Sequence, residues 1–261
     1  MATANDKQRA REQWTHDPAG AVYGRAHEFG TREFFDEVEH HRYEEYAPWM
    51  PKVMGFSDFA GQRLLEVGCG MGTDLLQFAR GGAEVYGIDL TEKAAKLARK
   101  RLGLYGLQGS ISISDSETLP FKSDSFDLVY SWGVIHHTPD TEAAAKEILR
   151  VCKPGGQVMV MLYHRRSNLA LQAWLFYGLL RGKPFKTPSQ VVSERVESPG
   201  TKVYTPKEGR ELFPGLSSVR IKRIVTRYDL RIGRRLFLPS WVRQIVPSRF
   251  GWFMVLEGQK T

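Results

Sequence analysis

Short apolar runs alternate with amphipathic stretches over residues 61–165, and this alternation dominates the pattern of the chain. Five runs are typical of buried strands, at 63–68, 84–90, 110–115, 126–132 and 156–163. Apolar positions at helical spacing lie between them, at 74–81, 91–102 and 141–152. Strands that alternate with helices predict a parallel sheet covered by helices on both faces. We expect helix N-caps at Thr91 and Thr141, each followed by a glutamate in the first turn.

The flanking regions follow other patterns. Residues 1–60 are aromatic-rich and predict a helical cap, whereas residues 216–261 contain two further strand candidates, at 219–230 and 252–260. Residues 166–215 break the strand and helix rhythm and form an insertion. Its apolar run at 169–180 fits either a helix that packs on the core or a hydrophobic lid over a substrate, and the sequence leaves both open.

Composition places the chain among ordinary globular proteins. It has 261 residues, of which 42% are hydrophobic and 25% charged. Two cysteines, Cys69 and Cys152, are too few for a disulfide framework or a cysteine zinc site, and no segment has metal-ligand spacing. The first residues lack the apolar stretch of a secretory signal, and the apolar run at 169–180 is shorter than the about 20 residues that span a bilayer. We therefore expect a cytoplasmic protein without a bound metal.

The net charge of +8 hides an asymmetry. Residues 1–150 hold 17 Lys and Arg against 23 Asp and Glu, whereas residues 151–261 hold 20 against 6. Between Arg220 and Arg249 nine basic residues face Asp229 alone. This segment fits a solvated basic face, a site for an anionic substrate, or a surface for a membrane or RNA. The sequence does not choose among them.

A glycine-rich turn follows the first predicted strand. Gly68, Gly70 and Gly72 stand between that strand and the next helix, with Glu66 two positions before the first glycine. Glycines let the backbone approach a ligand closely, and ligands of such folds bind at the carboxyl ends of the strands. The dinucleotide pattern needs a third glycine where Thr73 stands, and a carboxylate at Glu66 would repel a pyrophosphate but suit an ammonium group. The second strand ends at Asp89, where an acidic side chain can accept hydrogen bonds from ribose hydroxyls.

The segment 64–74 resembles motif I of the class I S-adenosylmethionine-dependent methyltransferases. Three further segments resemble that family in the same order, at 85–90, 114–140 and 147–161, so that the likeness covers about residues 61–163. The nearest likeness is to the ubiquinone/menaquinone-type small-molecule enzymes, which carry paired histidines after the fourth strand. The resemblance implies an α/β fold: a Rossmann-like, doubly wound, seven-stranded sheet, mostly parallel with an antiparallel last strand, plus a helical cap. It divides the chain into that cap (1–60), a cofactor-binding core (61–165), a substrate lid insertion (166–215) and C-terminal strands that complete the sheet (216–261).

The resemblance also implies the cofactor, S-adenosyl-L-methionine, with S-adenosyl-L-homocysteine as the product, and roles for individual residues. The loop glycines would pass close to the methionine and ribose parts, and Glu66 would reach the amino group. Asp89 would hold the ribose, and Leu90 would pack on the adenine. The remaining expected cofactor contacts are the adenine-side residues Asp115, Ser116 and Glu117, the strand-end residues Ser131 and Trp132, and a closing tyrosine, Tyr23.

Methyl transfer from a sulfonium needs positioning and exclusion of water more than a fixed set of catalytic groups. The candidate catalytic residues are His136, His137 and His164, which follow the fourth and fifth strands. The function expected is methylation of an apolar or anionic small molecule, with oxygen favoured over nitrogen or carbon as the acceptor atom. The alternatives are an RNA methyltransferase, a membrane-associated lipid or quinone methyltransferase, and a non-catalytic cofactor-binding protein. DNA is not expected as a partner, and RNA is disfavoured because no RNA-binding module is visible. Binding to a membrane surface stays open, and the sequence does not determine the oligomeric state.

Overall fold

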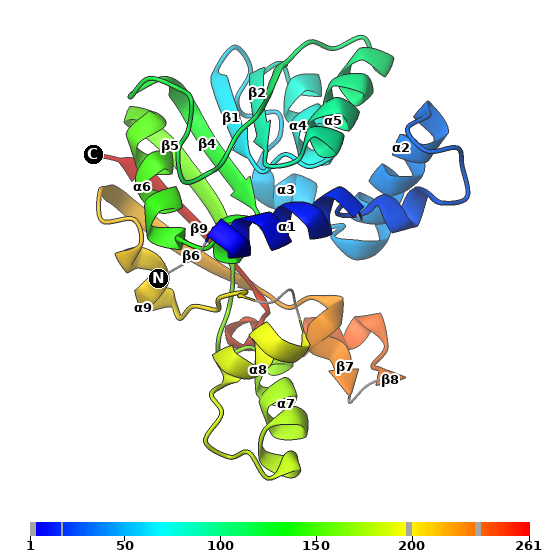
Figure 1. Cartoon of the computed structure of the whole chain (residues 1–261), viewed down its shortest axis with the longest axis vertical. Helices are drawn as coiled ribbons and strands as arrows, with labels where there is room; N and C mark the ends of the chain where they lie inside the picture. The colour runs from blue at the N-terminus through cyan, green and yellow to red at the C-terminus, as the bar shows by residue number, and fades with distance from the viewer. Residues whose placement is uncertain (1–3, 17, 197–199, 233–235) are drawn as a thin grey trace.

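A seven-stranded sheet organises the chain, and its strands lie in the order β3-β2-β1-β4-β5-β9-β6 (Figure 1). The computed structural model describes residues 4–16, 18–196, 200–232 and 236–261. The strands of the sheet are β1 (Arg63–Val67), β2 (Glu84–Asp89), β3 (Ser110–Ile113), β4 (Phe126–Trp132), β5 (Cys152–Tyr163), β6 (Leu216–Ile224) and β9 (Phe253–Lys260). Only β9 runs antiparallel to its neighbours β5 and β6, while the pairings among β1 to β5 are parallel. The expected sheet, mostly parallel with an antiparallel last strand, is confirmed.

Helices cover both faces of this sheet, as the alternation of strands and helices predicts. The helices of the core are α4 (Thr73–Arg80), α5 (Glu92–Leu104), α6 (Thr141–Val151) and α9 (Pro206–Glu211). Alternate residues of β1 point to opposite faces. Leu64 therefore packs with α4 and α5 in one apolar cluster, while Leu65 packs with α6 in another. At α5, Thr91 is the N-cap as expected, but α6 is capped by Asp140, whose side chain accepts from the Ala143 N–H, so the expectation for Thr141 was one residue late.

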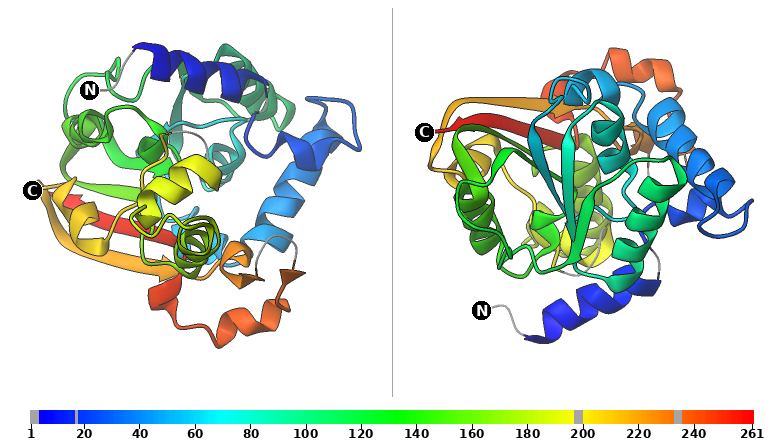
Figure 2. Two further views of the ribbon diagram at one scale, coloured as in Figure 1. Left: turned by 60° about the horizontal axis from the view of Figure 1, so that its bottom comes forward. Right: turned by 90° about the horizontal axis from the view of Figure 1, so that it is seen from above.

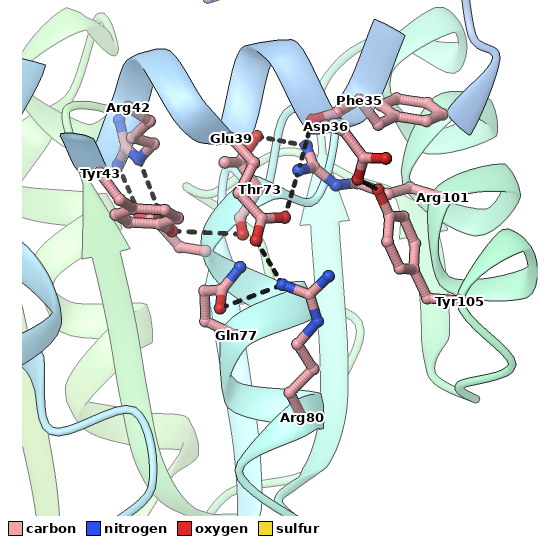
Figure 3. Close-up of polar contacts among 11 residues, drawn as sticks. Phe35, Asp36, Glu39, Arg42, Tyr43, Thr73, Gln77, Arg80, Arg101 and Tyr105 are labelled. Atoms are coloured by element: carbon pink, nitrogen blue, oxygen red, sulfur yellow. Dashed lines mark hydrogen bonds and ion pairs between the residues drawn. The ribbon is translucent and has the colours of Figure 1, made fainter. Parts of the chain in front are cut away.

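The N-terminal cap consists of α1 (Ala4–His16), the turn η1 (Ala21–Gly24), α2 (Arg32–His40), the π-helical turn η2 (His41–Tyr46) and α3 (Met50–Met54). Polar contacts join α2 and η2 to α4 and α5 (Figure 3). Arg101 of α5 is fully buried and donates to Glu39 Oε2 (3.0 Å) and to the Phe35 carbonyl (3.2 Å). Arg42 of η2 donates to the buried carboxylate of Asp74 on α4. The cap is thus fixed to the core by charge-assisted hydrogen bonds as well as by apolar packing.

Two further segments belong neither to the sheet and its covering helices nor to the N-terminal cap. The first follows β5 and consists of α7 (Asn168–Tyr177), η4 (Leu179–Arg181) and α8 (Pro188–Arg195). The second lies between β6 and β9 and consists of η5 (Arg227–Leu230), the strand pair β7 (Arg231–Ile232) and β8 (Leu236–Phe237), η6 (Ser240–Gln244) and η7 (Ser248–Phe250). Both project from the same end of the molecule (Figures 1 and 2). No helix in the described ranges is long and apolar enough to cross a bilayer.

The second segment corrects one prediction. The strand expected at 219–230 ends at Ile224, because Thr226 begins a turn that the Asp229 carboxylate closes. That carboxylate accepts from the N–H of Thr226 (2.8 Å) and from the N–H of Trp252 (2.9 Å). Asp229 therefore joins the turn to the start of β9. Its capping hydrogen bonds end the strand, although the β-branched residues of this segment favour a longer one.

Candidate active site

The glycine loop leaves β1 and enters α4 in a conformation that its glycines require. Gly68, Gly70 and Gly72 have φ of +78°, +52° and +72°. A Cβ on Gly68 would lie 2.3 Å from the side chain of Val134, so a larger residue there is excluded by space as well as by backbone conformation. The N–H groups of Gly68 and Cys69 donate to the Ile88 carbonyl (2.9 and 2.8 Å). These bonds hold the loop against the end of β2.

A pocket opens where β1, β2 and β4 end. It is lined by residues from the loop, the strand ends and α1: Trp14, Pro18, Ala19, Gly68, Gly70, Ile88, Asp89, Leu90, Thr91, Ala94, Ser114, Asp115, Ser116, Trp132, Gly133, Val134 and His137. Parallel strands bring their carboxyl ends to one edge, so residues far apart in sequence meet there. Seven of the twelve cofactor-side residues expected from the sequence line this pocket. They are Gly68, Gly70, Asp89, Leu90, Asp115, Ser116 and Trp132.

Asp89 is the central acid of the pocket. One carboxylate oxygen accepts from the N–H (2.9 Å) and hydroxyl (2.9 Å) of Thr91, and the other accepts from the Gly70 N–H (3.0 Å). Burial raises the pKa of Asp89, and the hydrogen bonds from Thr91 and Gly70 oppose that rise because they favour the charged form. The carboxylate is therefore fixed in orientation, and each of its oxygens keeps acceptor capacity for a ligand.

Glu66 lies behind the loop, in β1. It is buried, and its Oε2 atom has no hydrogen-bond partner among the described residues. Burial and the nearby charge of Asp74 raise the pKa of Glu66 well above its ordinary value. A buried carboxylate oxygen without a partner costs free energy, which a cationic or donor group of a ligand would offset. Glu66 itself does not line the pocket.

Helix α1 contributes to the wall of the pocket. Trp14 lines the pocket, and its ring meets that of His137 edge-on at 5.9 Å. Lys7 donates to Asp115 Oδ2 (2.6 Å) and forms an ion pair with Glu117. Glu117 also accepts from the Asp140 N–H (2.8 Å), so it serves the start of α6 and does not line the pocket. The contribution of α1 was missed from sequence, although Trp14 is the only aromatic residue of an otherwise polar stretch.

Three other expected cofactor residues lie outside the pocket lining. Gly72 is packed against Ala98 of α5. Ser131 donates its hydroxyl to the Val67 carbonyl (3.1 Å), which joins β4 to β1. Tyr23 is half-exposed and stacks on His41, with ring centroids 3.5 Å apart. In this conformation the tyrosine covers the cap instead of the pocket.

The three candidate catalytic histidines occupy different environments. His137 lines the pocket, its Nδ1 lies 2.9 Å from Thr201 Oγ1, and burial lowers its pKa to about 4. His136 is fully buried between the rings of His137 (4.3 Å) and Tyr163 (4.1 Å), and burial lowers its pKa well below the ordinary value. His164 is buried away from the pocket, with Nδ1 3.1 Å from the Gly251 carbonyl. Only His137 reaches the pocket.

Beyond Trp132 lies a group of rings that we call the aromatic cluster, which consists of Tyr46, Trp49, Trp132, Tyr163, Tyr228 and Phe253. The ring of Trp132 lies 5.7 Å from Phe253 and 5.9 Å from Trp49. Phe253 contacts the rings of Tyr163 (6.0 Å) and Tyr46 (6.1 Å). The cap, the core and the second projecting segment all contribute. Sequence reasoning did not group these residues, because they meet only through the tertiary fold.

Comparison with known proteins agrees with this geometry. Residues 65–160 match the family model described as a methyltransferase domain. A ubiquinone biosynthesis O-methyltransferase of Ralstonia nicotianae is 29% identical over 159 residues, 55% of this chain and 65% of that protein. Phosphoethanolamine N-methyltransferase 2 of Caenorhabditis elegans is 38% identical over 114 residues, 42% of this chain and 26% of that protein. An uncharacterised protein of Mycobacterium bovis is 38% identical over 119 residues, 45% of this chain and 43% of that protein. The chain therefore spans less than two thirds of these relatives.

Solved structures share the fold over a greater length. Magnesium protoporphyrin IX methyltransferase of Synechocystis PCC 6803, solved with bound S-adenosylmethionine, aligns over 100% of both chains with a TM-score of 0.60 and 16% identity. At this identity the likeness shows the fold alone. Residues 65–160 therefore resemble a methyltransferase domain, and the whole chain shares the fold of solved methyltransferases.

Proposed function

We propose that the protein is an enzyme that transfers the methyl group of S-adenosylmethionine to a small-molecule acceptor. The observation that carries this proposal is the pocket at the carboxyl ends of β1, β2 and β4, in which the glycine loop and Asp89 face each other. When bound, the cofactor supplies a methyl group on a positively charged sulfur, already activated toward a nucleophile. The residues present fit that molecule, because the loop glycines keep side chains out of the pocket and Glu66 holds a buried, unpartnered carboxylate oxygen beside it.

The chain's own residues divide the work of binding. Asp89 accepts hydrogen bonds from the ribose hydroxyls, since its carboxylate is already oriented by Thr91 and Gly70. Leu90 and Ile88 supply apolar contacts to the adenine, and Asp115 accepts from its amino group. Glu66 compensates the charge of the ammonium group from behind the loop. Each of the three acids thus has its own part of the cofactor to bind: Asp89 the ribose, Asp115 the adenine, and Glu66 the positively charged ammonium group at the opposite end from the adenine.

The acceptor is proposed to bind between the pocket and the aromatic cluster. Trp132 belongs to both, so it marks where the reacting groups meet. Stacked and edge-on rings favour a flat, apolar or aromatic acceptor. A pKa near 4 keeps His137 neutral at physiological pH, so the imidazole adds no positive charge beside the sulfonium. It also makes His137 a weak base, which suits orientation of an acceptor hydroxyl more than full removal of its proton.

We favour oxygen as the acceptor atom. The neutral, hydrogen-bonding His137 at the pocket wall suits a phenol or enol, and one of the relatives is named an O-methyltransferase. Another relative is named an N-methyltransferase, so amines belong among the acceptors to be tried.

The test has two parts. Calorimetry with S-adenosylhomocysteine should show one site per chain, and absence of binding would remove the cofactor assignment. Turnover is then followed as release of S-adenosylhomocysteine with phenols, hydroquinones and amines as acceptors. His137→Asn should lower kcat while the affinity for S-adenosylhomocysteine stays within about threefold. Cofactor binding without turnover on any acceptor would favour the non-catalytic alternative.

A further inference from the structure

The two segments outside the sheet expose large apolar side chains at one end of the molecule. We call residues 166–195 and 225–251 the basic apolar end. In the first segment Phe185 is 97% exposed and Leu180 is 66% exposed. In the second, Ile245 is 68% exposed and Trp241 is 60% exposed. Apolar surface gathered in this way on a protein marks an interaction site, whereas isolated exposed residues need no explanation.

The same residues carry almost the whole net charge of the chain. The described residues of the basic apolar end hold nine Lys and Arg against only Glu194 and Asp229, a balance of +7 in a chain whose total is +8. Asp229 is buried in its cap, and Glu194 offsets only Lys186, with which it pairs. Arg181 and Lys183 stand beside Leu180 and Phe185, and both are exposed.

The two segments form one surface. Asn168 at the start of α7 donates to the Asp229 carbonyl (2.6 Å), which joins the first segment to the second. Figures 1 and 2 show α7, β7 and β8 side by side beyond the ends of β5 and β6. Because α7 follows the carboxyl end of β5, and η5 that of β6, this surface lies at the edge of the sheet where the pocket also opens.

Helix α7 shows how the sequence builds this surface. It buries Leu169, Ala170 and Ala173 against the protein and exposes Leu171, Leu175 and Phe176. One face of this run packs inward, as the first interpretation expects, and the other faces solvent, while the substrate lid stays a prediction. None of the described residues of the first segment lines the pocket.

We propose that the basic apolar end docks the protein on the surface of an anionic lipid bilayer. Interfacial binding combines apolar side chains such as Trp, Phe, Leu and Ile that enter the headgroup region with Lys and Arg that pair with anionic headgroups. RNA would use the arginines and stack its bases on aromatic rings, but it gives no role to the exposed aliphatic side chains of Leu180 and Ile245. A second copy of the chain would bring two such surfaces together, each +7 on its described residues, and their repulsion opposes association.

Docking in this orientation turns the pocket edge toward the bilayer, where an apolar acceptor would be concentrated. The docking itself does not depend on the proposed methyl transfer, because vesicle binding is measured without cofactor or acceptor. A failure of either proposal therefore leaves the other standing.

The experiment is co-sedimentation with phosphatidylcholine vesicles that contain 0 or 30 mol% phosphatidylglycerol. Binding should require phosphatidylglycerol and weaken in 0.5 M salt. Arg181→Gln with Lys183→Gln should weaken binding about 25-fold, since each basic residue near an anionic surface contributes about fivefold. Trp241→Ser with Ile245→Ser should weaken it about tenfold or more through lost apolar burial. Leu104→Ser with Lys100→Gln on α5, far from this end, is the matched control and should bind as the unchanged protein does.

A second readout separates insertion from simple charge attraction. Brominated lipids should quench part of the tryptophan fluorescence, and Trp241→Phe should lose that part while it keeps vesicle affinity. Equal binding to both vesicle types, or equal loss in the α5 control, overturns the proposal. So does RNA binding without vesicle binding, or a dimer in sedimentation velocity that Trp241→Ser with Ile245→Ser dissolves while vesicles stay unbound.

Discussion

The buried carboxylate of Asp74 should be among the most sensitive positions for stability. It accepts from Arg42 Nε (2.6 Å) and Nη2 (2.5 Å), and from the hydroxyls of Tyr43 (2.6 Å) and Tyr130 (2.8 Å). These donors come from the cap and from β4, so one side chain joins the cap, α4 and the sheet. Figure 3 shows Arg42 and Tyr43 pointing from η2 toward α4. The perturbation is Asp74→Ala.

The magnitude follows from what the substitution leaves behind. Loss of one partner of a buried ion pair costs about 3–5 kcal/mol, because the other charge stays buried and unpaired. Arg42 keeps 22% of its side-chain surface exposed, so part of its charge can be resolvated. The two tyrosine hydroxyls also lose their acceptor. We expect the free energy of unfolding to fall by about 4 kcal/mol for Asp74→Ala, and by about 2 kcal/mol for Asp74→Asn, which keeps one acceptor oxygen.

Urea unfolding of a double-mutant cycle with Arg42→Met measures this interaction. The double variant should be little worse than Asp74→Ala alone, which gives a coupling free energy of about 2–3 kcal/mol. Glu92→Ala is the control, because its ion pair with Lys96 is exposed and screened by solvent, so its loss should leave the free energy of unfolding almost unchanged. Additive effects within about 0.5 kcal/mol would refute the reasoning, since they would mean that Arg42 and Asp74 do not depend on each other.

Three further predictions concern the pocket and its surroundings. Asp89→Ala should weaken S-adenosylhomocysteine binding about 100-fold in calorimetry, because two hydrogen bonds to a charged acceptor are lost; a change below threefold contradicts the ribose assignment. Burial lowers the pKa of His137 to about 4, whereas in the unfolded chain it stays near its ordinary value of about 6.5. As the pH falls, the unfolded chain therefore binds a proton at His137 before the folded chain does. This difference should lower the free energy of unfolding by about 2 kcal/mol between pH 7 and 5. His137→Asn should flatten the pH dependence of urea unfolding by that amount, and an unchanged slope contradicts the assigned pKa. Asp229→Ala should cost about 3 kcal/mol, because it leaves the buried N–H groups of Thr226 and Trp252 without acceptors; Asp229→Asn should recover most of the loss, and equal loss in both variants would point to the charge instead.

The core was predictable from sequence because its signals are local. Each strand from β1 to β5 is a short apolar run between helical stretches, and the loop glycines adopt conformations that only glycine accepts readily. Asp89 was placed because it ends a strand, and strand ends converge in a parallel sheet, whereas Asp115 was placed by the resemblance to the methyltransferase family. Pattern and topology therefore determine the pocket floor together.

The cover of the pocket was not predictable in the same way. Trp14 and Lys7 reach the site only because α1 folds back over the strand ends, and no periodicity in the first residues encodes that packing. Tyr23 was expected there on resemblance, but the structure stacks it on His41. The end of β6 was missed for a related reason, since Asp229 closes its turn with the N–H of Trp252, 23 residues further along the chain. Contacts between distant segments decide these features.

The distribution of charge connects the two ends of the molecule. The acids beside the pocket, Glu66, Asp89 and Asp115, are buried or half-buried and so act at short range on a ligand that carries a cation. The basic excess belongs to the basic apolar end, where exposed side chains such as Arg181 and Lys183 act at longer range on an extended anionic surface. Had the same arginines lined the pocket, they would have opposed the sulfonium and ammonium groups. The separation lets one chain bind a cationic cofactor and an anionic surface. It also explains why the net charge of +8 describes neither the acidic pocket nor the basic apolar end.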